Sequence, residues 1–162
     1  MDFSKLSRED WMVGAGGIAL ALSLLIFGWY SLSGYTVGGV TIGGASPAAT
    51  SAPYAIWGVL ALIATIVVVA DLALARFSPA TTVPTTALGR DMTRAAAAGV
   101  VALFLVIKFF AHVGSFGFGF VLDVILTIVV VAGAWMNAQG MSTRIGPATH
   151  SAPPSDPPAG QL

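Results

Sequence analysis

Four long stretches of apolar residues alternate with shorter polar segments along the chain. A helix that crosses the hydrocarbon core of a bilayer needs about 20 such residues, and each stretch approaches that length. The predicted spans are residues 11–30, 54–75, 95–113 and 119–138. Because a single segment in lipid must satisfy its own backbone hydrogen bonds, each span is expected to be helical. The pattern predicts an all-α membrane protein, a bundle of four transmembrane helices.

The segments on either side of residues 11–138 are predominantly polar or proline-rich. We expect residues 1–10 to form a short cytoplasmic N-terminus. Residues 139–162 cannot bury enough apolar surface to fold and are expected to be a disordered cytoplasmic tail. The first span could instead be a cleaved signal peptide. Its apolar run is longer than the core of such a peptide, and it ends in Trp29 and Tyr30 rather than in small residues.

The basic residues outside the spans indicate an orientation. Two precede the first span, three flank the connection between the second and third, and one follows the fourth: Lys5, Arg8, Arg76, Arg90, Arg94 and Arg144. The other two connections, residues 31–53 and 114–118, contain no charged residue. Since Lys and Arg concentrate on the cytoplasmic side of membrane proteins, both chain ends are predicted to be cytoplasmic.

Aromatic residues support the ends of the spans. All four tryptophans and two tyrosines lie within about one turn of a predicted helix end, where an apolar ring with a polar N–H or O–H suits the membrane interface. These residues are Trp11, Trp29, Tyr30, Tyr54, Trp57 and Trp135.

The first outer connection contains a turn signal. Two short β-prone runs, residues 35–37 and 40–42, flank Gly38 and Gly39. Glycine tolerates the positive φ angles of a tight hairpin turn, so this pattern predicts a small β-hairpin. A flexible loop is the alternative, and residues 43–53 are expected to be irregular.

Composition agrees with a membrane protein and excludes several other classes. The chain is 56% hydrophobic and 9% charged, where a soluble domain has roughly 25% charged residues. Its net charge is zero and no basic patch is present, which argues against nucleic acid as a partner. It has no cysteine, which excludes disulfides and thiol chemistry. The bilayer itself is the first expected partner.

Charged residues inside a span are costly and are therefore candidates for function. Lys108 and Asp123 lie equally far from the centre of the short turn between the third and fourth spans. Antiparallel helices joined by so short a turn should hold these two side chains level, so we predict an intramembrane ion pair. His112 lies one turn beyond Lys108 and Thr127 one turn beyond Asp123, on the same faces.

Three interpretations of Lys108 and Asp123 stay open. The two charges could neutralise each other and fix the register of the two helices. Alternatively, Lys108 could extend to the outer surface while Asp123 meets water alone. The third interpretation is a site that handles protons or ions. Asp71, near the inner end of the second span, is a further buried charge that Arg90 or Arg94 could reach, which favours a structural role.

No pattern of catalytic or cofactor-binding residues is present. The chain lacks the nucleophile, zinc and phosphate motifs of common enzyme families. Its two histidines, one of them in the tail, do not make a metal site. Gly14, Gly16 and Gly17 lie within a span and are typical of close helix packing. We therefore expect no enzyme, no cofactor and no metal.

Several short motifs resemble a loose family of small four-span actinobacterial membrane proteins of unassigned function. They are Phe3–Leu6, Phe27–Tyr30, Leu105–Phe110, Phe116–Gly119 and Ala132–Ala134. The chain departs from this pattern at Gly28, where proline is expected, and in carrying Asp123. The resemblance implies the same four-span topology and supplies no activity or ligand.

These observations lead to an expected function of a general kind. We expect a multi-pass protein of the bacterial inner membrane that acts without catalysis, through helix contacts with itself or with a larger envelope complex. The alternative is a small channel or transporter subunit that uses Lys108 and Asp123. Because four spans are few for a complete transporter, that alternative requires an oligomer.

Overall fold

The computed structural model describes residues 6–51, 54–78, 89–111 and 113–140. Its helices are α1 (Arg8–Ile26), α2 (Ala55–Phe77), α3 (Arg90–Ala111) and α4 (Phe118–Ala138). Each of the four is long and apolar enough to cross a membrane. The predicted four-helix architecture is confirmed, and the chain has the helices of a multi-pass membrane protein.

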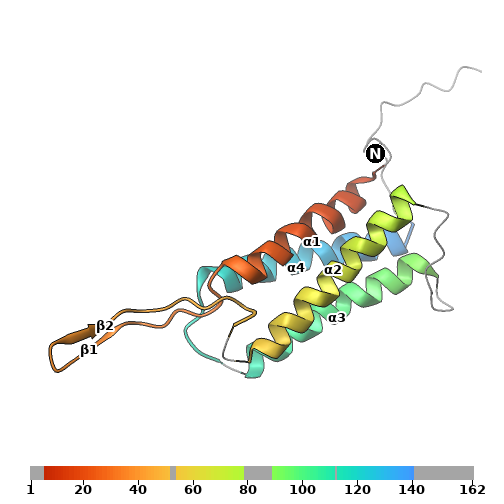
Figure 1. Ribbon diagram of the computed structural model, residues 1–162. Coiled ribbons are helices and arrows are strands. Elements are labelled where there is room, and N and C mark those ends of the chain that lie inside the picture. The colour runs from red at the N-terminus through yellow and green to blue at the C-terminus, as the bar shows by residue number, and fades with distance from the viewer. Residues whose placement is uncertain (1–5, 52–53, 79–88, 112, 141–162) are drawn as a thin grey trace, which may run out of the picture.

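The helices run alternately up and down and form a four-membered bundle (Figure 1). α1 packs against α2 and α4, and α3 packs against the same two helices. We call the end where α1 and α3 finish the hairpin end, because the β-hairpin projects from it. The opposite end holds the side chains of Arg8, Arg76, Arg90 and Arg94, and we call it the basic end.

Two helices, α1 and α3, begin well before the predicted spans. α1 starts at Arg8 because Ser7 caps it, in a reciprocal pair of hydrogen bonds with Asp10. It ends at Ile26, since Phe27 is extended. α3 starts at Arg90 rather than near residue 95, so its polar first turn is helical. Most of the predicted disordered tail lies outside the described residues.

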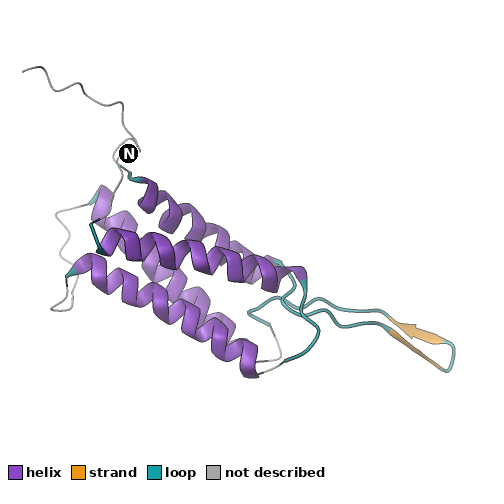
Figure 2. Ribbon diagram, turned by 180° about the vertical axis from the view of Figure 1, so that it is seen from behind, coloured by secondary structure: helices purple, strands orange, loops and turns teal. Residues whose placement is uncertain are grey.

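The predicted hairpin is present and projects well beyond the bundle (Figure 2). Strand β1 (Tyr35–Val37) pairs antiparallel with β2 (Val40–Ile42). Gly38 and Gly39 form the turn with φ of 59° and 83°, a conformation that favours glycine. Leu32 and Ala45 exchange backbone hydrogen bonds of 2.9 and 3.1 Å. The paired segment is therefore longer than expected, and we call residues 28–48 the arm.

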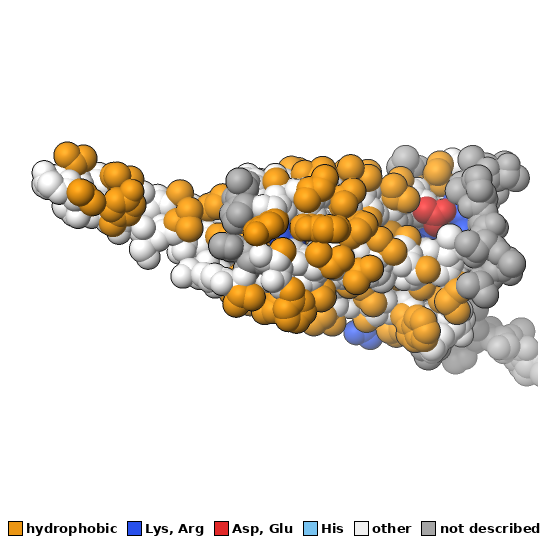
Figure 3. Space-filling model, turned by 90° about the horizontal axis from the view of Figure 1, so that it is seen from below, with side chains coloured by type: hydrophobic (Ala, Val, Ile, Leu, Met, Phe, Trp, Pro, Cys, Tyr) orange, Lys and Arg blue, Asp and Glu red, His pale blue; other side chains and the backbone are white. Residues whose placement is uncertain are grey.

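The apolar surface of the bundle divides between an interior and an outer surface. One buried cluster lies toward the hairpin end and includes Leu20, Leu24 and Leu105. A second lies toward the basic end and includes Val13, Val68 and Val130. Large apolar side chains also cover the outside of the helices (Figure 3), an exposure that suits lipid rather than water.

Glycines bring α1 and α4 close together. A Cβ atom at Gly119 would lie 2.7 Å from the carbonyl oxygen of Gly28, and one at Gly133 would lie 3.1 Å from that of Glu9. Gly16 faces Val129 and Val130 of α4. Gly16 thus serves the close packing that the sequence predicted. Gly119 faces the end of α1.

Candidate functional site

Lys108 is fully buried near the hairpin end of α3. Its Nζ donates a hydrogen bond of 3.2 Å to the carbonyl oxygen of Tyr54, which immediately precedes α2. The same nitrogen lies 5.3 Å from the ring centre of Tyr30 and 5.7 Å from that of Trp29. Aromatic faces attract a cation at such distances. Lys108 therefore joins the end of α3 to the start of α2 and to the base of the arm.

Trp29 and Tyr30 are not lipid-facing anchors, as their position at a span end had suggested. They are 0% and 1% exposed and cover the hairpin end of the bundle from inside. Trp29 packs edge-on against Phe120 of α4, with ring centres 5.3 Å apart. Tyr30 lies beyond the end of α1, where burial and the neighbouring Tyr54 raise the pKa of its hydroxyl. It is therefore an uncharged neighbour of Lys108.

Asp123 is also fully buried, but it occupies a different face of the bundle. Within the part of the chain that the structure describes, neither carboxylate oxygen has a hydrogen-bond partner. The hydroxyl of Ser23 in α1 lies beside the Asp123 carboxylate, although the two do not make a hydrogen bond of regular geometry. Asp123 thus belongs to the interface between α1 and α4.

The structure does not join Lys108 and Asp123 in an ion pair. Counting residues from the turn between the two helices predicted that both side chains lie at the same level. It did not determine how α4 is rotated about its own axis. Gly119 packs on the end of α1, and this turns the face that carries Asp123 toward α1. Lys108 is directed toward Tyr54 instead, and the Trp29 ring packs against both Lys108 and Phe120. Lys108 does not reach the outer surface either.

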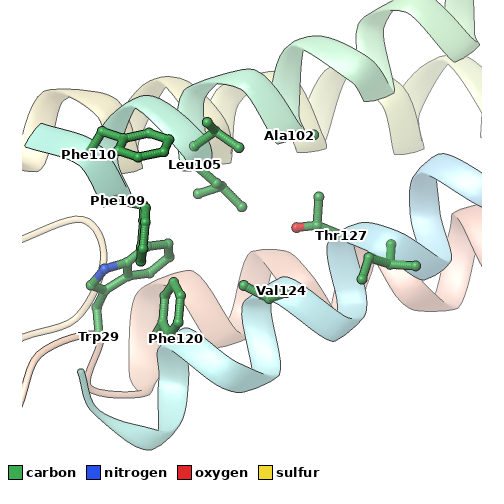
Figure 4. Close-up of a pocket in the computed structure, with 10 residues that line it drawn as sticks. Trp29, Ala102, Leu105, Phe109, Phe110, Phe120, Val124 and Thr127 are labelled. Carbon is green, nitrogen blue, oxygen red and sulfur yellow. The ribbon is translucent and has the colours of Figure 1, made fainter. Parts of the chain in front are cut away.

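Thr127 lies one turn from Asp123 and borders a cavity of about 400 Å³ between α3 and α4 (Figure 4). Its hydroxyl oxygen points toward this cavity and has no hydrogen-bond partner among the described residues. Trp29, Phe109 and Phe120 close one end of the cavity, whose lining is almost entirely apolar. His112, the remaining member of the predicted group, lies outside the described residues.

Asp71 makes the contacts that were expected of it at the basic end. The sequence left Arg90 and Arg94 as alternative partners of Asp71, and in the structure both contact it. Arg90 Nε donates to one carboxylate oxygen at 2.9 Å, and Arg94 Nε donates to the other at 2.8 Å. Arg94 also donates to Asp91 at 3.1 Å. These contacts stabilise the packing of α2 on α3.

A second polar cluster at the basic end was missed from the sequence. Asp10 is buried and accepts hydrogen bonds from the backbone of Ser7 at 3.0 Å, from Arg76 at 2.9 Å and from Asn137 at 3.1 Å. One carboxylate thus connects α1, α2 and α4. The capping pattern around Ser7 was a local signal for Asp10. Nothing in the sequence paired Asp10 with Asn137, because their contact depends on the register of α1 against α4.

The base of the arm is joined to the turn between α3 and α4. Ser31 N donates to Ser115 O and Gly117 N donates to Trp29 O, each at 2.8 Å. Gly119 N donates to Gly28 O at 2.9 Å. The arm, the aromatic residues and the start of α4 therefore form one connected unit around Lys108.

The described residues contain no group of three His, Cys, Asp or Glu side chains that could hold a metal ion. Comparison with known proteins adds no relative: no family model, no curated protein and no solved structure matches this chain.

Proposed function

We propose that this chain is a non-enzymatic protein of the bacterial inner membrane that binds a partner protein through its arm. The observation that carries the proposal is the exposed apolar face of the hairpin. Four side chains on the paired strands are between 48% and 66% exposed: Tyr35, Val37, Val40 and Ile42. Since side chains alternate along a strand, these four share one face, opposite Thr36 and Thr41.

An exposed hairpin of this kind favours a protein partner. A two-stranded hairpin is at best marginally stable alone in water, and open strand edges promote pairing with other chains. Proteins commonly protect such edges with charged residues, but residues 31–53 contain none. A partner that covers the apolar face would stabilise the arm and remove its apolar side chains from water.

The orientation expected from the sequence places this partner outside the cytoplasm. Four of the six basic residues that support the orientation lie among the described residues, and all four are at the basic end. The positive-inside rule makes that end cytoplasmic, so the arm projects from the outer face of the membrane. The partner is then another envelope protein or a second copy of this chain. Membership of the loose actinobacterial family stays a prediction.

Crosslinking from single cysteines tests the proposal. Because the chain has no cysteine, one introduced thiol is a unique attachment point for a photoactivated crosslinker. Val37→Cys carries it on the apolar face, and Thr36→Cys is the matched control on the opposite face of the same strand. In intact cells we expect a discrete crosslinked protein from Val37→Cys and much less from Thr36→Cys. Mass spectrometry then identifies the partner. Equal, diffuse labelling from both positions would refute the proposal.

A second candidate, a channel or transporter subunit, is favoured by one observation. Asp123 is a buried carboxyl inside a membrane helix without a hydrogen-bond partner in the described part of the chain. Such groups commonly mark ion or proton pathways. If the chain conducts, liposomes containing it should pass ions or solute, and Asp123→Asn should abolish that flux. Normal flux in this variant, or none from the unaltered protein, would count against this candidate.

A further inference from the structure

We infer that Asp123 and Ser23 form a binding site for one monovalent cation, a proton or a sodium ion, between α1 and α4. The inference does not depend on either candidate function, since a site of this kind can serve structure, sensing or transport. It rests on the position of these two side chains, on their unused hydrogen-bonding capacity and on the charge balance around them.

The register of α1 against α4 brings Asp123 level with Ser23. Gly119 N donates to Gly28 O at 2.9 Å, which fixes the contact at the hairpin end. One turn deeper along each antiparallel helix stand Ser23 and Asp123, which are 1% and 0% exposed. Thr127, one further turn along α4, points its hydroxyl into the cavity between α3 and α4 and is not part of this site.

Three polar oxygen atoms in this region have no hydrogen-bond partner among the described residues. They are both carboxylate oxygens of Asp123 and the hydroxyl oxygen of Ser23. A helical hydroxyl in an apolar setting usually donates to the carbonyl four residues earlier, as Thr65 does to Ala61 at 2.8 Å. Ser23 does not, so its hydroxyl is available beside the Asp123 carboxylate.

The charge balance requires a bound cation. Of the other buried carboxylates, Asp10 receives three donors including Arg76, and Glu9 lies at the opposite end of α1 with an interaction of its own. The partly buried Asp71 contacts two arginines. Among the described residues Asp123 has no such compensation, and an ionised carboxylate buried without a partner is too costly to persist. A single carboxylate is neutralised by one positive charge. Divalent cations usually take several carboxylates, so a monovalent ion fits better.

Among the residues that the structure describes, the charged and titratable groups around Asp123 do not supply that positive charge. From α3, Lys108 is directed to the carbonyl oxygen of Tyr54 and makes no ion pair with Asp123. On α1, Glu9 and Asp10 lie at the opposite end of the helix. Tyr30, from the base of the arm, is a neutral phenol. The apolar cavity beside Thr127 adds no charged group.

Infrared spectroscopy of the full-length protein in lipid nanodiscs tests the site. In potassium buffer at neutral pH we expect the carbonyl stretch of a protonated carboxylic acid, and we expect Asp123→Asn to lose it. Asp91→Asn, which changes a carboxyl that is 55% exposed, is the control and should keep the band. Because Asn resembles a neutral Asp in size, the variant should fold.

Replacing potassium by sodium distinguishes the two ions. Loss of the acid band in sodium indicates that sodium displaces the proton, and an unchanged band indicates a proton site; both outcomes support the inference. Ser23→Ala should shift the band or weaken any sodium effect at least several-fold, which tests the site even if Asp123→Asn does not fold. An ionised Asp123 in potassium buffer, with no acid band, would overturn the inference.

Discussion

Asp10 shows how one carboxylate can join several helices. Its three donors come from the start of α1, the end of α2 and the end of α4. The side chain of Asp10 is completely buried, while that of Arg76 is 36% exposed. Removing the acceptor would take away the hydrogen bond that Asn137, which is 6% exposed, donates to Asp10. A buried donor without its acceptor costs free energy because water cannot replace the lost bond.

We predict that Asp10→Ala destabilises the bundle by about 2 kcal/mol. This is less than the roughly 3–5 kcal/mol for breaking a fully buried ion pair, because water solvates part of Arg76. The measurement is the fraction of protein that stays monodisperse in mild detergent after heating. Asp91→Ala is the matched control, and we expect it to destabilise the bundle by less than about 0.5 kcal/mol. The Asp91 carboxylate is mostly exposed, and Arg94 retains its ion pair with Asp71 in this variant. Equal losses in both variants would contradict this account.

Among the helices, the contact between α1 and α4 determines the orientation of the whole α4 face. Gly119 meets the carbonyl oxygens of Phe27 and Gly28, so an added methyl group would force the backbone apart. The same face carries Asp123 one turn later and Asn137 near the far end of the helix. A shift at Gly119 would therefore change the contacts along the whole interface between α4 and α1.

We predict opposite effects for two glycine-to-alanine changes in helices. Gly119→Ala should cost about 1–3 kcal/mol through overpacking against backbone atoms. Gly99→Ala in α3 meets nothing within 4 Å and should stabilise by up to about 1 kcal/mol, because alanine favours a helix. Thermal unfolding in detergent, followed by circular dichroism, measures both. If both variants gained stability, the close approach of α1 and α4 at Gly119 would be wrong.

Local sequence patterns predicted most of the fold and little of the candidate site. Span length and the Gly38–Gly39 turn are properties of neighbouring residues, and both predictions were confirmed. The surroundings of Asp123 and the contacts of Lys108 depend on how each helix is rotated about its own axis. That rotation is determined by the contact of Gly119 with a distant loop, which counting turns along one pair of helices could not supply.

At the scale of the whole molecule, the two ends of the bundle differ in how many charged side chains they carry. The basic end holds Arg8, Arg76, Arg90 and Arg94, and the last three contact acidic partners. The arm at the hairpin end presents uncharged, largely apolar side chains. From the positive-inside rule we expect the two ends to lie on opposite sides of the membrane, and the proposed role of the arm depends on that expectation.

Reporter fusions test the orientation directly. Alkaline phosphatase is active only outside the cytoplasm, so we expect activity from fusions within residues 31–53 or 114–118 and none from fusions after residue 138. A cytoplasmic reporter such as β-galactosidase should give the reverse pattern and controls for expression. Phosphatase activity after residue 138 would place the arm in the cytoplasm. The partner would then have to be sought there, although the four helices and the pairing of their side chains would stand.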